Sequence, residues 1–164
     1  PFSKITFGGH QERDRRPGTE NTAGIVGLGK AIELATVSLN QNNAQIEALR
    51  DYFISQITSK LTGVVINGDL KKRISNNINI SFENVDGETL LQNLDLIGIC
   101  VSSGSACSSG SLAPSHVLLA LGLDKATAKS SIRVSLNKYN TKEELNFTID
   151  AIVKIVNNLR NIKY

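Results

Sequence analysis

Two short stretches of this chain alternate polar and apolar residues, and this alternation constrains the fold more than any other feature. Residues 77–82 read Asn-Ile-Asn-Ile-Ser-Phe, and residues 130–136 read Ser-Ser-Ile-Arg-Val-Ser-Leu. Successive side chains of a strand point to opposite faces, so each stretch predicts a strand with one buried face and one polar face. We therefore expect an α+β domain in which helices cover a small, mainly antiparallel sheet.

The helices that would cover this sheet are predicted from the periodicity of apolar residues. Apolar residues recur on one face from Thr22 to about Leu39, and again over roughly 43–61, with a polar break at residues 40–43 between them. Thr141 to Glu144 form a capping box that opens a final helix. The second helix is expected to bury Ile46, Leu49, Phe53, Ile57 and Leu61, and the last one Leu145, Ile149, Ile152, Val153, Val156 and Leu159.

Four shorter elements complete the expected order. Pro114 and Gly122 bracket a helix because proline is tolerated in a first turn and glycine follows helix ends. Cys100 is expected in the core because it sits in an apolar run that predicts a strand. The four are a strand at 64–66 closed by a turn at 67–69, a helix from the cap Asp86 to Leu94, a strand at 97–101 and the helix at 114–121.

Composition excludes several function classes. The 164 residues suffice for one domain with a core, and the net charge of +3 is scattered, which argues against a nucleic-acid partner. The chain has no apolar run of bilayer length and no signal-peptide pattern, so we expect a cytoplasmic protein without membrane contact. Two cysteines and two histidines without ligand spacing predict no metal site.

A loop of small residues holds one of the two cysteines. Residues 101–111 read Val-Ser-Ser-Gly-Ser-Ala-Cys-Ser-Ser-Gly-Ser, with Cys107 near the middle. No side chain here can anchor a core, and the two glycines free the backbone. The stretch predicts either a simple connector or a thiol that must approach a reaction partner. The loop contains no Lys, Arg or His, so activation of the thiol would have to come from elsewhere.

Two further stretches leave their role open on residue chemistry alone. Residues 1–21 carry glycines, charges and Pro17-Gly18, which predict either a solvated linker or an anion-handling loop that uses Arg side chains and Thr19. Arg133 either points into solvent or offers a bidentate fork to a carboxylate. Residues 24–31 nearly spell a P-loop, but Ala31 lacks the hydroxyl that a metal ion requires.

Three stretches together resemble the C-terminal part of a cysteine desulfurase, a pyridoxal-phosphate enzyme of the class V aminotransferase group. They are residues 8–21, with Gly-Gly-His-Gln-Glu-Arg and Arg-Pro-Gly-Thr-Glu-Asn, residues 102–110, with Ser-Ser-Gly-Ser-Ala-Cys-Ser-Ser-Gly, and residues 130–136. The resemblance runs nearly end to end, and the cysteine loop is its most specific part. It implies the small domain of a fold-type-I transferase over residues 41–164, with residues 1–40 closing the large cofactor-binding domain.

The resemblance also implies a reaction and its residues. Family members convert L-cysteine to L-alanine and keep the sulfur as a persulfide on the loop cysteine, here Cys107. Arg133 matches the residue that holds the substrate carboxylate. Thr19 matches a residue that reaches the pyridoxal-phosphate phosphate of the partner subunit in a homodimer. Iron–sulfur scaffold proteins are typical sulfur acceptors, and selenocysteine lyase is a close relative with the same reaction type.

One departure from the family pattern bears on activity. The family binds its cofactor through a lysine in a Ser-x-His-Lys segment, and neither His10 nor His116 is followed by lysine here. The chain also contains no methionine. We therefore expect a piece of a longer enzyme that cannot form the Schiff base or turn over cysteine alone. A stand-alone persulfide carrier is the alternative from another class.

Overall fold

The computed structural model describes residues 3–103 and 114–162, and the chain falls into two compact units. The first comprises residues 1–39 and the second residues 40–164. Each unit is described on its own below. The cysteine loop, including Cys107, lies outside the described residues, so the prediction of a reactive thiol at that position stays a prediction.

The first unit contains α1 (Gln11–Asp14) and α2 (Thr22–Val37). Within α1, the turn through Glu12, Arg13 and Asp14 has positive φ angles of 52°, 58° and 65°, which non-glycine residues rarely adopt. The carboxylate of Asp14 binds the ammonium of Lys4 and, at 2.6 Å, Nδ1 of His10. These two hydrogen bonds hold the pKa of Asp14 below its usual range, and the bond from Lys4 has the larger effect. The predicted irregular segment thus contains an ordered turn.

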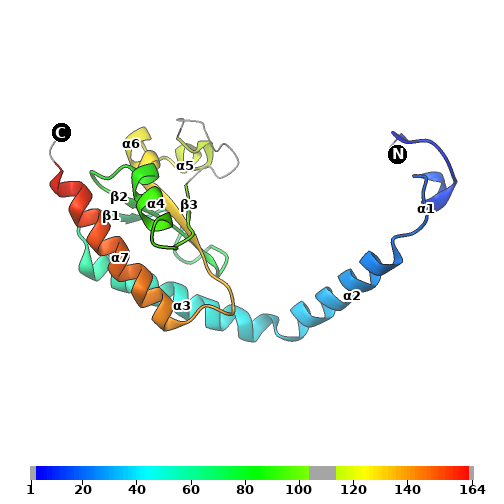
Figure 1. Ribbon diagram of the computed structural model, residues 1–164, viewed down its shortest axis with the longest axis horizontal. Helices are drawn as coiled ribbons and strands as arrows, with labels where there is room; N and C mark the ends of the chain where they lie inside the picture. The colour runs from blue at the N-terminus through cyan, green and yellow to red at the C-terminus, as the bar shows by residue number, and fades with distance from the viewer. Residues whose placement is uncertain (1–2, 104–113, 163–164) are drawn as a thin grey trace. The chain divides into compact units, whose positions relative to one another are not determined.

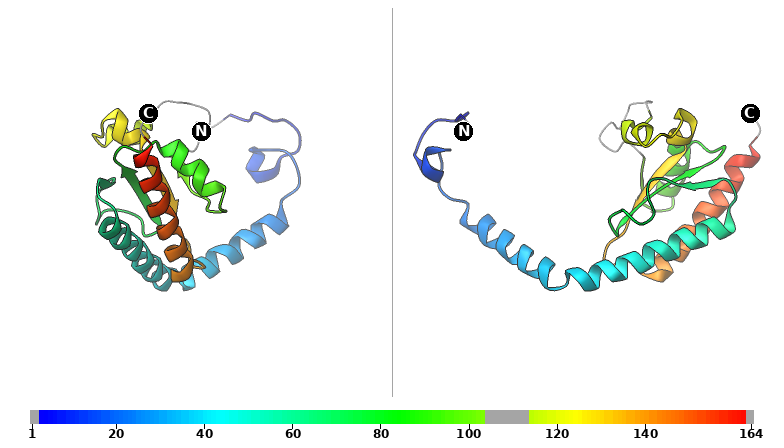
Figure 2. Two further views of the ribbon diagram at one scale, coloured as in Figure 1. Left: turned by 60° about the vertical axis from the view of Figure 1, so that its left-hand side comes forward. Right: turned by 180° about the vertical axis from the view of Figure 1, so that it is seen from behind.

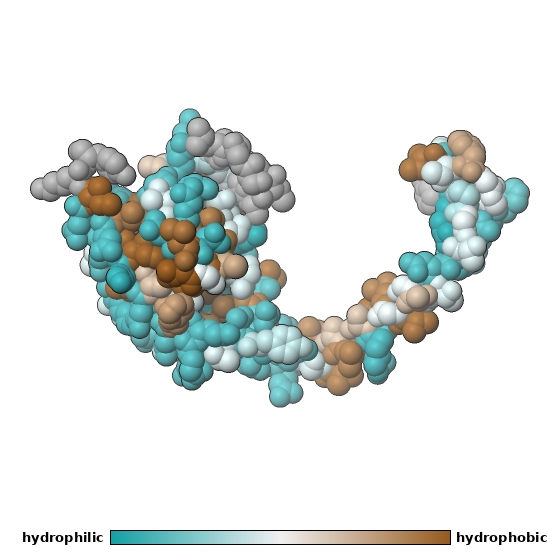
Figure 3. Space-filling model, in the orientation of Figure 1, coloured by the Kyte–Doolittle hydropathy of each residue, from teal (hydrophilic) through white to brown (hydrophobic). Residues whose placement is uncertain are grey.

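The helix α2 exposes its apolar residues within this chain. None of its residues is buried, and Ile25, Leu28 and Ile32 are each more than half exposed, although the sequence places them on one face. Figure 3 shows apolar residues at the surface along this helix. Among the described residues, no single helix is long and apolar enough to cross a membrane, although α2 and the next helix, α3 (Leu39–Lys60), together meet that test by length and composition alone.

The second unit is built on a four-stranded antiparallel sheet in the order β1-β2-β4-β3 (Figure 1). The register pairs Ile80 of β2 with Ile66 of β1 and with Ile132 of β4. This arrangement agrees with the α+β prediction of a small antiparallel sheet. The strands are β1 (Val64–Ile66), β2 (Asn77–Phe82), β3 (Ser102–Ser103) and β4 (Ser131–Ser135).

Helices cover both faces of this sheet. The long helices α3 and α7 lie side by side, as Figures 1 and 2 show. Among the contacts between them, Tyr52 Oη donates to Asn146 Oδ1 at 2.6 Å, and Lys60 Nζ pairs with Asp150 Oδ1 at 2.7 Å. The helices of this unit are α3 (Leu39–Lys60), α4 (Gly87–Asp95), α5 (His116–Ala120), α6 (Lys125–Lys129) and α7 (Lys142–Asn161).

One face of the sheet carries the core. Burying apolar surface of this kind is the main driving force for folding. The apolar positions that alternation predicted for β2 and β4 are buried against α3, α4 and α7, and the predicted stripe of α3 is buried in full. The fully enclosed side chains include Phe53, Ile57, Ile78, Ile80, Phe82, Leu90, Leu94, Ile132, Ile149, Ile152 and Val156.

The other face is polar and is partly covered by α6. Ser81 Oγ donates to the carbonyl of Thr127 at 2.8 Å, and Ser131 Oγ donates to the carbonyl of Ala128 at 2.8 Å. Asp124 caps the helix by accepting hydrogen bonds from the backbone and side chain of Thr127. Sequence reasoning did not identify α6, because five residues are too few for periodicity to show.

The expected strand at 97–101 is wrong. Gly98 has φ +79°, its N–H binds the carbonyl of Asp95 at 2.9 Å, and the N–H of Ile99 binds the carbonyl of Leu94 at 3.0 Å. This pair of bonds is the glycine-terminated helix end known as a Schellman motif, so the stretch closes α4 instead of starting a strand. Cys100 follows the motif and is exposed, so its predicted core position is also wrong.

The predicted polar break at residues 40–43 is wrong as well, because α3 already begins at Leu39. Polar groups near its start contact loops of the second unit: Asn43 Oδ1 accepts from Ser75 Oγ at 3.2 Å, and Gln45 Nε2 donates to the carbonyl of Lys138 at 3.3 Å. Tertiary contacts of this kind override weak helix propensity. The helix expected at 114–121 is shorter, His116–Ala120, with Gly122 just past its end at φ +89°.

Two predicted helix starts are confirmed. Asp86 accepts the N–H of Thr89 at 2.8 Å and caps α4, and Thr141 with Glu144 forms the capping box of α7. Gly87, the first residue of α4, allows a close backbone approach: a Cβ there would lie 2.6 Å from the carbonyl oxygen of Lys129 and 2.8 Å from that of Ser131. This glycine therefore permits α4 to pack directly on the start of β4.

Candidate functional site

The polar face of the sheet contains a row of four side chains, one from each strand. Asn79 pairs with Arg133 in the β2–β4 register, and Arg133 pairs with Ser102 in the β3–β4 register. The bond from Asn67 N to Asn79 O, 2.9 Å, extends the β1–β2 register by one residue. Paired residues of antiparallel strands project from the same face. We call Asn67, Asn79, Arg133 and Ser102 the polar row.

Arg133 is the one cation of the polar row. It is half-buried, and its Nε is enclosed without a hydrogen-bond partner among the described residues. The ordinary partner of an enclosed guanidinium is a carboxylate, which it grips with two parallel N–H···O bonds. No described carboxylate pairs with Arg133, so the N–H groups of its two Nη atoms are available to donate hydrogen bonds to an external anion. The sequence left open whether this side chain points into solvent or offers a bidentate fork to a carboxylate, and the role of Arg133 stays a prediction.

The cysteine loop begins at the neighbouring strand. Ser102 lies opposite Arg133 and Ser103 opposite Ile132, and the described chain stops there until Pro114. Cys107 comes four residues after Ser103. A fully extended chain of four residues spans at most about 14 Å. Because Ser102, the member of the row on β3, lies one residue further back, at most about 18 Å of extended chain joins the row to position 107.

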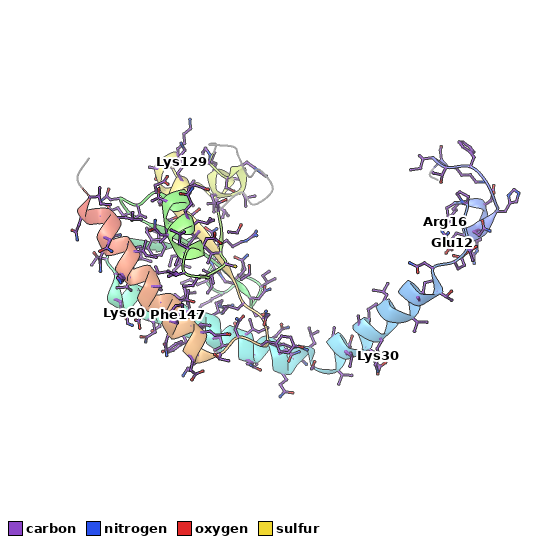
Figure 4. The ribbon with its side chains drawn as sticks, in the orientation of Figure 1. Glu12, Arg16, Lys30, Lys60, Lys129 and Phe147 are labelled. Atoms are coloured by element: carbon purple, nitrogen blue, oxygen red, sulfur yellow. The ribbon has the colours of Figure 1, made fainter. Side chains whose placement is uncertain are left out.

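Thr19 belongs to the first unit, so the structure does not bring it together with Arg133. It is exposed between α1 and α2, and within the part of the chain that the structure describes its hydroxyl has no hydrogen-bond partner. The guanidinium of Arg16 organises this segment by binding Glu20 and donating to the carbonyl of Gly18 at 2.8 Å. Figure 4 shows Glu12 beside Arg16. The Glu12 carboxylate lies 3.7 Å from Arg16 Nη2.

Sequence reasoning missed two members of the polar row. It assigned Asn79 only to an alternating strand and Asn67 only to a turn, whereas Asn67 is 4% exposed and extends β1. Its Nδ2 donates to Asn79 Oδ1 at 2.6 Å and to Ser81 Oγ at 2.8 Å. The available signal was the matching alternation of the two strands, which places polar residues of both on one face.

A separate surface hollow of about 620 Å³ lies next to β1. Val65, Ser81, Asp86 and Lys129 are among its lining residues, and none of the predicted site residues lines it. Lys129, the last residue of α6, is labelled in Figure 4. Of the predicted site residues that the structure describes, Arg133 lies in the polar row and Thr19 in the first unit.

Comparison with known proteins shows which family this chain belongs to. The model of the aminotransferase class-V family matches residues 4–147. The chain belongs to this family. It is 50% identical over 158 residues to the cysteine desulfurase IscS of Dictyoglomus turgidum and 44% identical over 161 residues to the cysteine desulfurase NifS of Azotobacter vinelandii. These alignments cover 96% and 98% of this chain and 40% of each relative.

A solved structure supports the same relationship. A NifS-like protein superposes with a TM-score of 0.81 at 35% identity, over 96% of this chain and 40% of that protein. The family resemblance read from the three motifs is thus confirmed. This class-V chain spans about 40% of the length of the curated relatives it matches. Full-length enzymes of the family are pyridoxal-phosphate-dependent, and its cysteine desulfurases act on cysteine.

Proposed function

We propose that this chain is the part of a cysteine desulfurase that binds the substrate carboxylate and accepts the sulfur. The whole enzyme would convert L-cysteine to L-alanine and transfer the sulfur to Cys107 as a persulfide. One observation carries the proposal: Ser102, at the root of the cysteine loop, pairs directly with Arg133. A substrate held by Arg133 would thus lie within reach of a thiol tethered four residues beyond Ser103.

Arg133 binds and orients the substrate in this proposal. Its Nη groups hold the carboxylate of L-cysteine, and the rigid strand β4 fixes the fork between two neighbouring strands. Pyridoxal phosphate, when bound, supplies the electron sink that lets the bond between carbon and sulfur break. The thiolate of Cys107 attacks the substrate sulfur, a sulfur–sulfur bond forms, and the electron pair of the carbon–sulfur bond stays with the carbon skeleton. Protonation of that carbon completes L-alanine.

The residues of the first unit fit one end of the cofactor. The hydroxyl of Thr19 is exposed and available as a donor, and it lies three residues before α2. We assign it to the cofactor phosphate of the partner subunit in a homodimer. In the complete enzyme, residues 1–40 would close the large cofactor-binding domain, and residues 41–164 would form the small domain. A cytoplasmic location and delivery of sulfur to an iron–sulfur scaffold protein belong to the same proposal.

The test is a hybrid enzyme in which this chain replaces the matching part of the Dictyoglomus turgidum relative. Conversion of L-cysteine to L-alanine is measured with pyridoxal phosphate present, and persulfide is located by mass spectrometry. We expect Cys107→Ser to abolish turnover and persulfide formation. Cys100→Ser is the matched control, because that thiol is exposed and only seven residues away. Unchanged turnover in Cys107→Ser, or a persulfide on Cys100, would overturn the proposal.

A further inference from the structure

Two buried polar atoms without partners lie in the polar row. Among the described side chains only three buried polar atoms lack a hydrogen bond, and two of these are Asn67 Oδ1 and Arg133 Nε. An enclosed donor or acceptor without a partner is costly, so natural proteins rarely retain one without a reason. Two of them in one row show that the hydrogen bonds of this row are not fully satisfied in this structure.

Asn79 lies between these two atoms. It pairs with Arg133 on β4, and its backbone bonds to Asn67 on β1. Directly opposed residues of antiparallel strands have Cβ atoms about 4.5–5.5 Å apart, so the carboxamide of Asn79 can reach either neighbour. In this structure its Oδ1 accepts from Asn67 Nδ2 at 2.6 Å.

Asn67 does not depend on that bond alone. Its Nδ2 also donates to Ser81 Oγ at 2.8 Å, and Ser81 Oγ in turn donates to the carbonyl of Thr127 at 2.8 Å. If the Asn79 carboxamide turned away, Asn67 would keep the serine as an acceptor. The oxygen of Asn79 also has two lone pairs and can accept two donors. Asn79 is therefore free to serve the arginine.

The arginine needs such a partner from within the protein. A guanidinium has five donors and no acceptor, and a carboxylate from solvent can approach the Nη groups but not the enclosed Nε. Ser102, the neighbour on the other side, directs its hydroxyl to the carbonyl of Ser103 at 3.1 Å. Asn79 is then the row member whose oxygen is best placed to accept from Nε.

We infer that Asn79 is a positioning residue for Arg133, accepting its Nε–H while the two Nη groups hold the carboxylate of an α-amino acid. The inference rests on the proposed function, because it takes Arg133 as the carboxylate-binding group. This hydrogen bond fixes the rotation of the guanidinium plane before the substrate binds. The Arg133 side chain therefore loses less conformational entropy when its Nη groups bind the carboxylate. Asn79 thereby tunes substrate affinity without contacting the substrate.

Kinetics of the hybrid enzyme test this role. Hydrogen bonds to charged groups are strong enough that Asn79→Leu is expected to raise KM for L-cysteine about tenfold, with kcat nearly unchanged. Asn79→Asp keeps an oxygen at the position and is expected to recover most of the affinity. Asn77→Leu is the matched control, because Asn77 lies on the same strand and face but opposite Ser135. It should leave KM unchanged.

Three outcomes separate this inference from the proposed function. If Arg133→Lys leaves KM unchanged, the assignment of the carboxylate to Arg133 fails. If Arg133→Lys raises KM and Asn79→Leu does not, only the role of Asn79 fails. If Ser102→Ala raises KM and Asn79→Leu does not, the serine is the acceptor and the inference is likewise overturned.

A spectroscopic measurement on the 164-residue chain itself covers the case in which Asn79→Leu does not fold. The ¹⁵N resonance of Arg133 Nε–H is recorded for the unchanged chain, for Asn79→Asp and for Asn77→Asp. We expect the resonance to shift in Asn79→Asp, where a carboxylate oxygen faces the Nε–H, and to stay in place in Asn77→Asp. An unchanged resonance in Asn79→Asp would overturn the inference.

Discussion

The two faces of the sheet in the second unit are held in different ways. On one face, Ile80 and Ile132 are fully buried beneath long helices, and no specific hydrogen bond orients them. On the other, Ser81 and Asn67 are almost as enclosed, but each is fixed by hydrogen bonds. The first face supplies stability by burying apolar area, and the second supplies direction, because hydrogen bonds fix orientation as well as position. Among the described residues of the sheet, the candidate anion site at Arg133 lies on the second face.

The largest expected effect concerns the apolar face. Ile80→Ala removes a fully buried side chain in the middle of β2 and is expected to lower the free energy of unfolding by about 2–5 kcal/mol. Urea denaturation of the chain, followed by circular dichroism, measures this. Val65→Ala is the matched control on the other side of the sheet, where the side chain is 48% exposed. Equal losses in the two variants would contradict the contrast between the faces.

A smaller effect is expected on the polar face. Ser81→Ala removes the hydroxyl that accepts from Asn67 and donates to Thr127, and should lower the free energy of unfolding by about 1–3 kcal/mol. The same urea experiment applies, with the exposed Ser135→Ala as control. A Ser81→Ala variant as stable as the control would mean that this hydrogen-bond chain does not stabilise the fold.

The smallest expected effect is a pH dependence of α6, which covers part of the polar face. Hydrogen bonds hold the pKa of Asp124 below its ordinary value of 3.8, and the bond from the Thr127 side chain has the largest effect. The charged cap therefore stabilises the helix above that value, and its contribution is lost as pH falls through the lowered pKa. Asn also caps helices but does not titrate, so Asp124→Asn should show a weaker loss of α6 amide protection in acid. Identical acid profiles would contradict this.

The sequence predicted most features that depend on neighbouring residues and missed those that depend on residues far apart in the chain. Alternation and capping are local, so the burial of Ile78, the cap at Asp86 and the box at Thr141 were all predictable. The helix end at Gly98 was missed because a glycine inside an apolar run gives no sign of its positive φ. The start of α3 was missed because distant loops satisfy its polar side chains.

The candidate site was predictable in part. Arg133 and Thr19 were named from motifs, and their roles remain predictions, as does that of Cys107. The polar row was not predictable, because the partner of Asn79 depends on which strands become neighbours. More than 45 residues, including α4 and the cysteine loop, separate β2 from β4 in sequence. No local pattern fixes a register across that separation, which tertiary packing sets instead.

The strand β3 consists of only two residues, Ser102 and Ser103, at the outer edge of the sheet. So short a segment is held by few backbone bonds and is expected to detach at much lower free energy than the strands beside it. Its release would lengthen the tether of Cys107 by two residues while leaving β2 and β4 joined. Under the proposed function, this release lets the segment that holds Cys107 extend toward a sulfur acceptor while β4, which carries Arg133, stays paired in the sheet.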